Sequence, residues 1–194
     1  ISPSDLGGTK RLSGASEGED SEKALAAGTV LHRLLEILPA IPDHQRETAA
    51  QRICDGMSEA KIAGDVPALI ESALALVRDP TLAGIFSEDA LCEVAFSAHL
   101  PTLGEAPVFG TIDRLIVGPD DVLVIDYKSN RSVPECPESI PEGVLRQLGA
   151  YAAAMAQIYP DLPIRTAVLW TEERRFMEVP PHLVSAALGR AAVT

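Results

Sequence analysis

The residues best suited to chemistry are Asp113, Asp126 and Lys128, which lie in two β-rich runs of the sequence. These runs, 111–117 and 122–129, flank a Gly-Pro-Asp-Asp segment whose residue types supply the backbone dihedrals of a tight turn. The pattern therefore predicts a β-hairpin that carries two carboxylates and an ammonium group.

The register of this hairpin decides whether the two carboxylates meet. With an even, symmetric loop, Val117 faces Val122. Counting outward from that pair places Asp113 directly opposite Asp126. Directly opposed side chains have Cβ atoms about 4.5–5.5 Å apart, and like charges at that distance are destabilising unless something neutralises them. A divalent cation between the carboxylates would do so.

Asp126 and Lys128 are two residues apart, so they share one face of their strand. Carboxylate oxygens suit Mg²⁺ or Mn²⁺, and such a cation can activate water, act as a Lewis acid or clamp a phosphate. The lysine can hold the attacking water or offset charge in the transition state. These residue types indicate metal-dependent phosphodiester hydrolysis. The alternative is a hairpin with solvated Asp and Lys side chains.

Four further residues are candidates for the same site, each with a structural alternative. His32 is either a histidine at the edge of a core helix or a metal ligand. Glu93 is either a solvated strand glutamate or a carboxylate close to the metal. Gln147 and Tyr151 are four apart on a helix and can reach the same neighbour, although the pair taken alone could be incidental.

The elements that must position these residues follow from hydrophobic periodicity. Helices are expected at 22–38, 43–63, 66–78, 142–158 and 181–192, with a short helical turn at 80–86. Strands are expected at 90–100, 164–171 and 175–179, in addition to the hairpin. The expected order is helices, then three strands, then a helix, then one or two strands, then a last helix. This order favours an α/β fold in which a mixed central sheet is flanked by helices and the N-terminal part is helical.

Residues 1–22 are rich in Ser, Gly, Asp and Glu, and they predict a flexible linker before a domain at 23–194. Because the chain begins at Ile1, we expect it to be a domain of a longer protein. No apolar run could span a membrane and no signal peptide is indicated, so a soluble, cytoplasmic protein without a membrane partner is expected. Three scattered cysteines fit neither a disulfide framework nor a Cys-x-x-Cys metal cluster.

The net charge of −12 argues against a nucleic-acid partner, because phosphate binding draws on Lys and Arg. The distribution weakens this objection, since residues 1–109 carry a net charge of −9 and residues 110–194 only −3. A polyanion would still need a basic partner or local steering by Arg114, Lys128, Arg131, Arg146, Arg165, Arg174 and Arg175.

Four motifs in order resemble the RecB-type nuclease branch of the PD-(D/E)xK superfamily: Gly28-x-x-x-His32, Gly110-Thr-Ile-Asp113-Arg-Leu, Asp126-Tyr-Lys128-Ser and Gln147-x-x-x-Tyr151. Within this branch the chain is most similar to the C-terminal nuclease domain of AddA-type helicase-nuclease subunits, in their alphaproteobacterial form. The resemblance implies a restriction-endonuclease-like sheet.

The resemblance also implies roles for individual residues. His32, Asp113 and Asp126 would bind Mg²⁺ together with the backbone carbonyl of Tyr127, and Mn²⁺ or Ca²⁺ could substitute in binding. Lys128 would serve the attacking water. Gln147 and Tyr151 would position the catalytic strand or the DNA backbone. Several relatives hold an iron–sulfur cluster on four cysteines, and the three cysteines here predict that this chain has none.

The implied function is a DNA nuclease, of exonuclease type, that cuts unwound strands during double-strand break repair by homologous recombination. Its expected partners are single-stranded DNA, helicase domains of the same polypeptide and an AddB-like subunit. Two alternatives are a catalytically inactive nuclease-like module for DNA binding or assembly, and a stand-alone exonuclease or restriction-type enzyme of the same superfamily.

Overall fold

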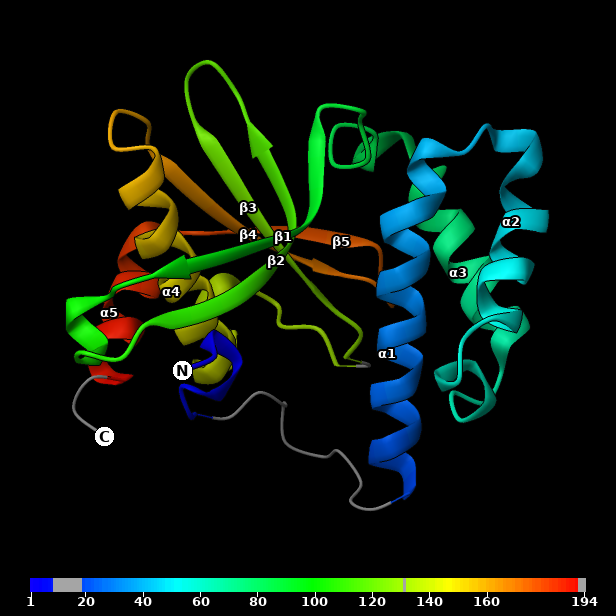
Figure 1. Cartoon of the computed structure of the whole chain (residues 1–194), viewed down its shortest axis with the longest axis horizontal. Helices are drawn as coiled ribbons and strands as arrows, with labels where there is room; N and C mark the ends of the chain where they lie inside the picture. The colour runs from blue at the N-terminus through cyan, green and yellow to red at the C-terminus, as the bar shows by residue number, and fades with distance from the viewer. Residues whose placement is uncertain (9–18, 131, 192–194) are drawn as a thin grey trace. The chain divides into compact units, whose positions relative to one another are not determined.

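The computed structural model describes residues 1–8, 19–130 and 132–191 (Figure 1). The chain divides into two compact units. One, the helical unit, comprises Gly14–Ala90, and the other, the sheet unit, comprises Ile1–Ser13 with Leu91–Thr194. Among the described helices, none has both the length and the apolar character needed to cross a bilayer.

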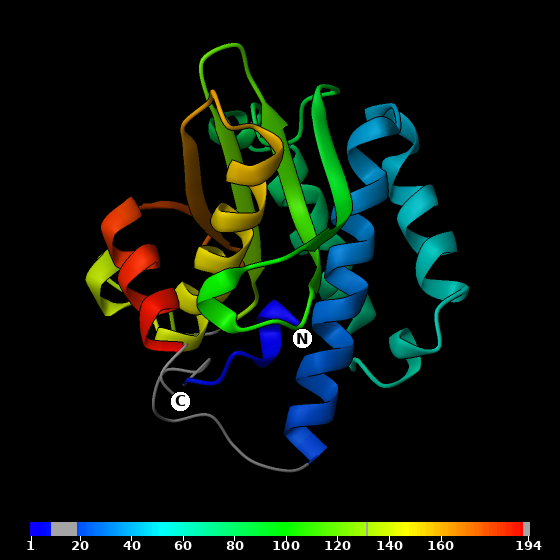
Figure 2. The same ribbon diagram turned by 60° about the vertical axis from the view of Figure 1, so that its left-hand side comes forward.

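The helical unit is built from three α-helices that pack side by side (Figure 2). They are α1 (Glu19–Ile37), α2 (Asp43–Asp55) and α3 (Val66–Val77), with 3-10 turns η2 (Leu38–Ala40), η3 (Glu59–Lys61) and η4 (Pro80–Leu82). The leucine stripe predicted for the first helix is buried, because Leu31, Leu34, Leu35 and Leu38 are at most 2% exposed. The Asp65 side chain caps α3 by accepting from the Ala68 amide at 3.1 Å.

The second helix is shorter than predicted, since α2 ends at Asp55 rather than continuing to residue 63. Gly56 follows it directly and donates its backbone N–H to the carbonyls of the last turn. Glycine has a low helix propensity, which explains the end of the helix there. Within the rest of the predicted helix, residues 57–63, the structure has only the 3-10 turn η3.

The sheet unit has a five-stranded sheet in the order β1-β2-β3-β4-β5. The strands are β1 (Ala90–Ala98), β2 (Val108–Val117), β3 (Val122–Lys128), β4 (Ile164–Trp170) and β5 (Arg175–Val179). β2 pairs antiparallel with β3, β3 parallel with β4, and β4 antiparallel with β5. The parallel pair needs a crossover, which α4 (Glu142–Ile158) supplies. The prediction of a mixed sheet with flanking helices and helices at the N-terminal end is confirmed.

Two helices of the sheet unit pack on each other, α4 and α5 (Pro181–Ala191) (Figure 1). α4 also packs against β3 and β4. The contact between the helices is close because Gly149 has no side chain: a Cβ there would lie 2.5 Å from the carbonyl oxygen of Val184. Arg190 of α5 donates from Nε and from a terminal nitrogen to the Glu142 carboxylate of α4, both at 2.8 Å. This arrangement holds α4 over the strands that carry the candidate site.

The first eight residues belong to the sheet unit and include the 3-10 turn η1 (Pro3–Asp5). The Ile1 ammonium group donates to the carbonyl of Pro107 at 3.0 Å, and the Phe109 amide donates to the carbonyl of Ile1 at 2.9 Å. Arg146 of α4 donates to the carbonyl of Leu6 at 3.0 Å. The middle of the linker expected at 1–22, residues 9–18, lies outside the described residues. The expected boundary of a nuclease domain at residue 23 stays a prediction.

Candidate active site

The hairpin has the register that the sequence predicted. Val117 faces Val122 and Arg114 faces Ile125 across β2 and β3. The Gly118 amide closes the turn by donating to the carbonyl of Asp121 at 2.9 Å. Asp113 directly precedes Arg114 on β2 and Asp126 directly follows Ile125 on β3, so the two aspartates stand one residue beyond the last assigned pair of the two neighbouring strands.

The Asp113 side chain is fixed by the backbone of the neighbouring strand. The Tyr127 amide donates to Oδ2 of Asp113 at 2.6 Å. This bond joins the two strands next to the assigned pair of Arg114 and Ile125. A short, charge-assisted bond of this kind holds a carboxylate in one orientation.

A chain of polar contacts runs from Asp126 on β3 to Tyr151 on α4. Lys128 Nζ lies 2.6 Å from Oδ2 of Asp126 and donates to Oε1 of Gln147 at 3.0 Å. Gln147 in turn donates from Nε2 to the Tyr151 hydroxyl at 2.8 Å. Asp126 is only 2% exposed, so its charge is buried beside the ammonium group. The structure thus brings together four of the residues that the sequence singled out.

The Tyr151 phenol on α4 is affected by its burial and by nearby carboxylates. Burial raises its pKa far above the ordinary tyrosine value, and the charge of Asp126 raises the pKa further. Asp113 and Glu93 act in the same direction, while the hydrogen bond from Gln147 opposes them. The phenol therefore stays protonated at neutral pH.

Glu93 lies close to Asp113, a neighbour that the sequence alone could not predict. Its side chain is exposed on β1, and one carboxylate oxygen of Glu93 and one of Asp113 lie within 4.8 Å of each other. Glu93 also has a φ of 49°, in the left-handed region that is uncommon for residues other than glycine. Such backbone strain often marks functional sites. The structure places Glu93 close to Asp113 and also exposed, so the role of a carboxylate close to a metal stays a prediction.

His32 lies on α1 of the helical unit, and its side chain is half-buried. It directly follows Leu31, which is part of the buried leucine stripe. Its expected role as a metal ligand stays a prediction. So does the role of the Tyr127 carbonyl, whose residue lies between Asp126 and Lys128 on β3.

The basic side chains expected to steer a polyanion are largely engaged within the protein. Arg114 is only 2% exposed and donates to the Tyr127 hydroxyl, so it does not serve as a surface cation. Arg165 pairs with the carboxylates of Asp121 and Glu178. Arg175 donates to two main-chain carbonyls, and Arg131 lies outside the described residues. Sequence reasoning missed the burial of Arg114 because arginine is a surface residue in most proteins.

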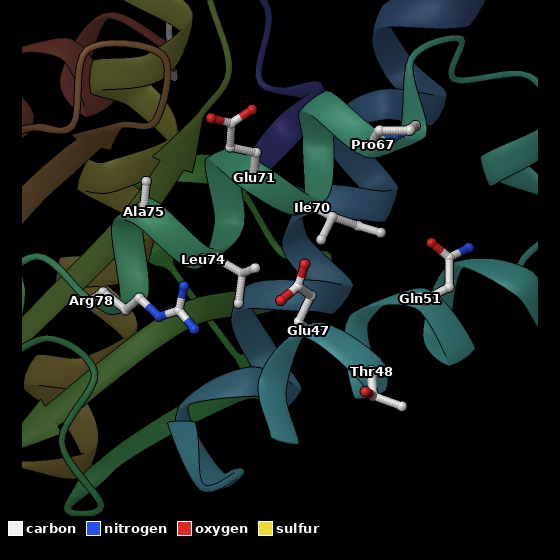
Figure 3. Close-up of a pocket in the computed structure, with 9 residues that line it drawn as sticks. All are labelled: Glu47, Thr48, Gln51, Pro67, Ile70, Glu71, Leu74, Ala75 and Arg78. Atoms are coloured by element: carbon white, nitrogen blue, oxygen red, sulfur yellow. The ribbon is translucent and has the colours of Figure 1, made fainter. Parts of the chain in front are cut away.

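A groove of about 740 Å³ occurs elsewhere, in the helical unit between α2 and α3 (Figure 3). Its lining mixes apolar side chains with two carboxylates, and consists of Glu47, Thr48, Gln51, Pro67, Ile70, Glu71, Leu74, Ala75 and Arg78. None of the residues predicted for the site lines it. The candidate active site is therefore the polar cluster on the sheet and not this groove.

Comparison with protein families places the chain in a known class. Residues 8–187 match the PD-(D/E)XK nuclease superfamily, and because this match spans most of the sequence, the chain belongs to that superfamily. A solved structure described as "Crystal structure of SSO0001" is similar to the chain with 17% sequence identity and a TM-score of 0.42. The similarity covers 87% of this chain and 82% of that chain. No curated protein matches the chain significantly.

The donor set of the cluster fits a divalent cation of the kind that nucleases use. The carboxylates of Asp113, Asp126 and Glu93 are hard oxygen ligands, which suit Mg²⁺ and Mn²⁺. Three carboxylates gathered near one phenol would repel one another, and a bound cation would offset that repulsion. Lys128 belongs to the same cluster through its contact with Asp126.

Proposed function

We propose that this chain is a divalent-metal-dependent deoxyribonuclease that hydrolyses phosphodiester bonds. The observation that carries the proposal is the contact between Lys128 and Asp126, on the hairpin whose other strand presents Asp113. A carboxylate pair can hold a divalent cation that assists phosphodiester hydrolysis, and an adjacent ammonium group can offset the charge that develops in the transition state. Membership of the nuclease superfamily supports the same reaction.

Each residue has a defined task in this proposal. Asp113 and Asp126 would hold Mg²⁺, with His32 and the carbonyl of Tyr127 completing the ligand set. A divalent cation held by these residues would supply Lewis acidity. Lys128 holds the attacking water or offsets charge on the phosphorus oxygens through its ammonium group.

The helix α4 supports the lysine from the other side. Gln147 accepts from Lys128 through Oε1 and donates to the Tyr151 hydroxyl through Nε2, so the orientation of its amide is fixed at both ends. A fixed amide holds the ammonium group close to Asp126 and limits its rotamers. Electrostatic catalysis depends on this kind of preorganisation.

The four ordered motifs extend the proposal to the RecB-type branch and to AddA-type helicase-nucleases. In that setting helicase domains of the same polypeptide unwind cytoplasmic DNA and deliver a single strand, and an AddB-like subunit completes the assembly. Delivery by a motor would make the acidity of this chain tolerable, because other modules would supply the phosphate contacts. Finding whether the parent gene also encodes a helicase motor separates this proposal from a stand-alone exonuclease.

The central test is cleavage of labelled single-stranded DNA in Mg²⁺ by Asp113→Ala and Lys128→Ala. We expect each variant to lose about 10²–10³-fold or more in rate, because each removes a group that acts on the transition state. Asp121→Asn is a matched control, since this carboxylate lies at the turn of the same hairpin and pairs with Arg165. Undiminished cleavage by Asp113→Ala or Lys128→Ala would contradict the proposal.

A further inference from the structure

Tyr127 is held at two points by consecutive residues of the neighbouring strand. Its backbone amide donates to Oδ2 of Asp113 at 2.6 Å, and its hydroxyl accepts from Nε of Arg114 at 3.0 Å. Side chains alternate along β3, and Lys128 contacts α4, so the Tyr127 ring lies on the face of the sheet opposite to α4. The residue is thus tied to β2 through both its backbone and its side chain.

The bond between Arg114 and Tyr127 is buried. Arg114 is 2% exposed and Tyr127 is 3% exposed. Burial raises the pKa of Tyr127 to about 12, although the charge of Arg114 and its hydrogen bond act in the opposite direction. The hydroxyl is therefore neutral at physiological pH and accepts a charge-assisted hydrogen bond from the guanidinium group. A buried guanidinium that loses a partner is costly, so this contact resists change.

The next residue along β3 is fixed as well. The carbonyl of Lys128 accepts from the Thr171 amide at 2.9 Å and from the Thr171 hydroxyl at 3.3 Å. The Tyr127 carbonyl lies between these two anchored points of the backbone. With the amide of Tyr127 and the carbonyl of Lys128 both held, the peptide plane between them has little freedom to rotate.

We propose that Arg114 and the Tyr127 hydroxyl are positioning residues for the metal centre. Together they lock the strand segment that carries Asp126 and the Tyr127 carbonyl against the segment that carries Asp113. This role rests on the proposed function, because it assumes that the cation binds at these groups. The pair touches neither substrate nor cation and acts through the ligands that it holds in place.

The choice of residues suits this task. We call the hydrogen-bonded pair of Arg114 and the Tyr127 hydroxyl the clamp. Asp113 directly precedes Arg114 on β2, and Asp126 directly precedes Tyr127 on β3, so each proposed ligand is next to a member of the clamp. A slip of the hairpin by one residue would turn every side chain to the other face and break both contacts to Tyr127 at once. The clamp therefore stabilises the same register that brings the carboxylates together.

The test compares Mn²⁺ affinity, measured by isothermal titration calorimetry, in the whole chain and in Tyr127→Phe and Arg114→Met. Phenylalanine keeps the ring and removes only the hydroxyl. We expect each variant to bind Mn²⁺ about 10-fold more weakly or worse, as found when groups that orient metal ligands are removed. Should Arg114→Met fail to fold, Arg114→Lys keeps the charge, loses the Nε donor, and is expected to show the same loss.

Thr166→Val is the matched control. Thr166 is 2% exposed on the same sheet, and its hydroxyl donates to the carbonyl of Val179 at 3.3 Å. We expect this variant to lower the melting temperature without changing Mn²⁺ affinity. If Tyr127→Phe and Arg114→Met behave in the same way, the clamp is only structural and the inference is wrong.

A failure of the proposed function gives a different result. In that case the unsubstituted chain binds no Mn²⁺, or Asp113→Asn binds it as tightly as the unsubstituted chain does. Mn²⁺ binding that depends on Asp113 but not on Arg114 or Tyr127 overturns the clamp alone.

Discussion

At the scale of single residues, the candidate site depends on how its charged side chains are paired and hydrogen-bonded. Asp126 is buried and paired with Lys128, and the lysine also donates to Gln147. An ammonium group held between a carboxylate and an amide stays in one place, whereas a solvated lysine samples many rotamers. The same contacts explain why a buried carboxylate is tolerated here, because a charge without a partner would be costly.

Glu93 offers a prediction at this scale. Its carboxylate lies within 4.8 Å of that of Asp113, so Glu93→Gln removes a negative charge beside the proposed ligand set while keeping the shape of the side chain. We expect the Mg²⁺ concentration for half-maximal cleavage to rise about 10-fold, as for other groups that support metal ligands. Titration of the cleavage rate with Mg²⁺ measures this.

The control for that experiment is Glu105→Gln, an exposed glutamate in the connection between β1 and β2. It is expected to leave the Mg²⁺ dependence unchanged. If Glu93→Gln also leaves it unchanged, Glu93 is a solvated strand residue after all.

At the scale of elements, turn chemistry and helical spacing made the site predictable. The Gly-Pro-Asp-Asp segment indicated a hairpin turn, the register was predicted by assuming an even loop there, and the observed pair Val117 and Val122 agrees with that assumption. The spacing of Gln147 and Tyr151 placed both on one helical face, and they are hydrogen-bonded. The neighbour of Glu93 could not be predicted, because it depends on how β1 pairs with β2. The end of α2 at Asp55 was missed because amphipathic periodicity continues past Gly56.

The packing of α4 on α5 gives a prediction for this scale. In Gly149→Ala the added methyl would meet the carbonyl oxygen of Val184 at 2.5 Å, and backbone cannot move aside cheaply. We expect the free energy of unfolding to fall by about 1–3 kcal/mol, the usual cost of overpacking. Urea denaturation followed by circular dichroism measures it.

Gly189→Ala on α5 is the matched control. A Cβ at Gly189 meets nothing within 4 Å, so alanine adds helix propensity without a clash. We expect stability to rise by about 0.5–1 kcal/mol. Equal effects of the two substitutions would show that the contact between α4 and α5 is looser than the structure describes.

At the scale of the whole molecule, most of the net negative charge lies in the first part of the sequence. Residues 1–109 carry a net charge of −9 and residues 110–194 carry −3, and the second range holds the hairpin and α4. The division into two units near residue 90 was not predicted, because no change in composition marks that point of the sequence. Hydrophobic periodicity along the sequence indicates individual helices and strands, whereas the division into two units depends on which helices and strands pack against one another.

The most direct test of the central claim is the position of Mn²⁺ in crystals soaked with this ion, located by its anomalous scattering. We predict a peak within ligand distance of the carboxylates of Asp113 and Asp126, at about 2.0–2.3 Å from the nearest oxygens. A peak elsewhere, or no peak at these carboxylates at an Mn²⁺ concentration that supports DNA cleavage, would contradict the account.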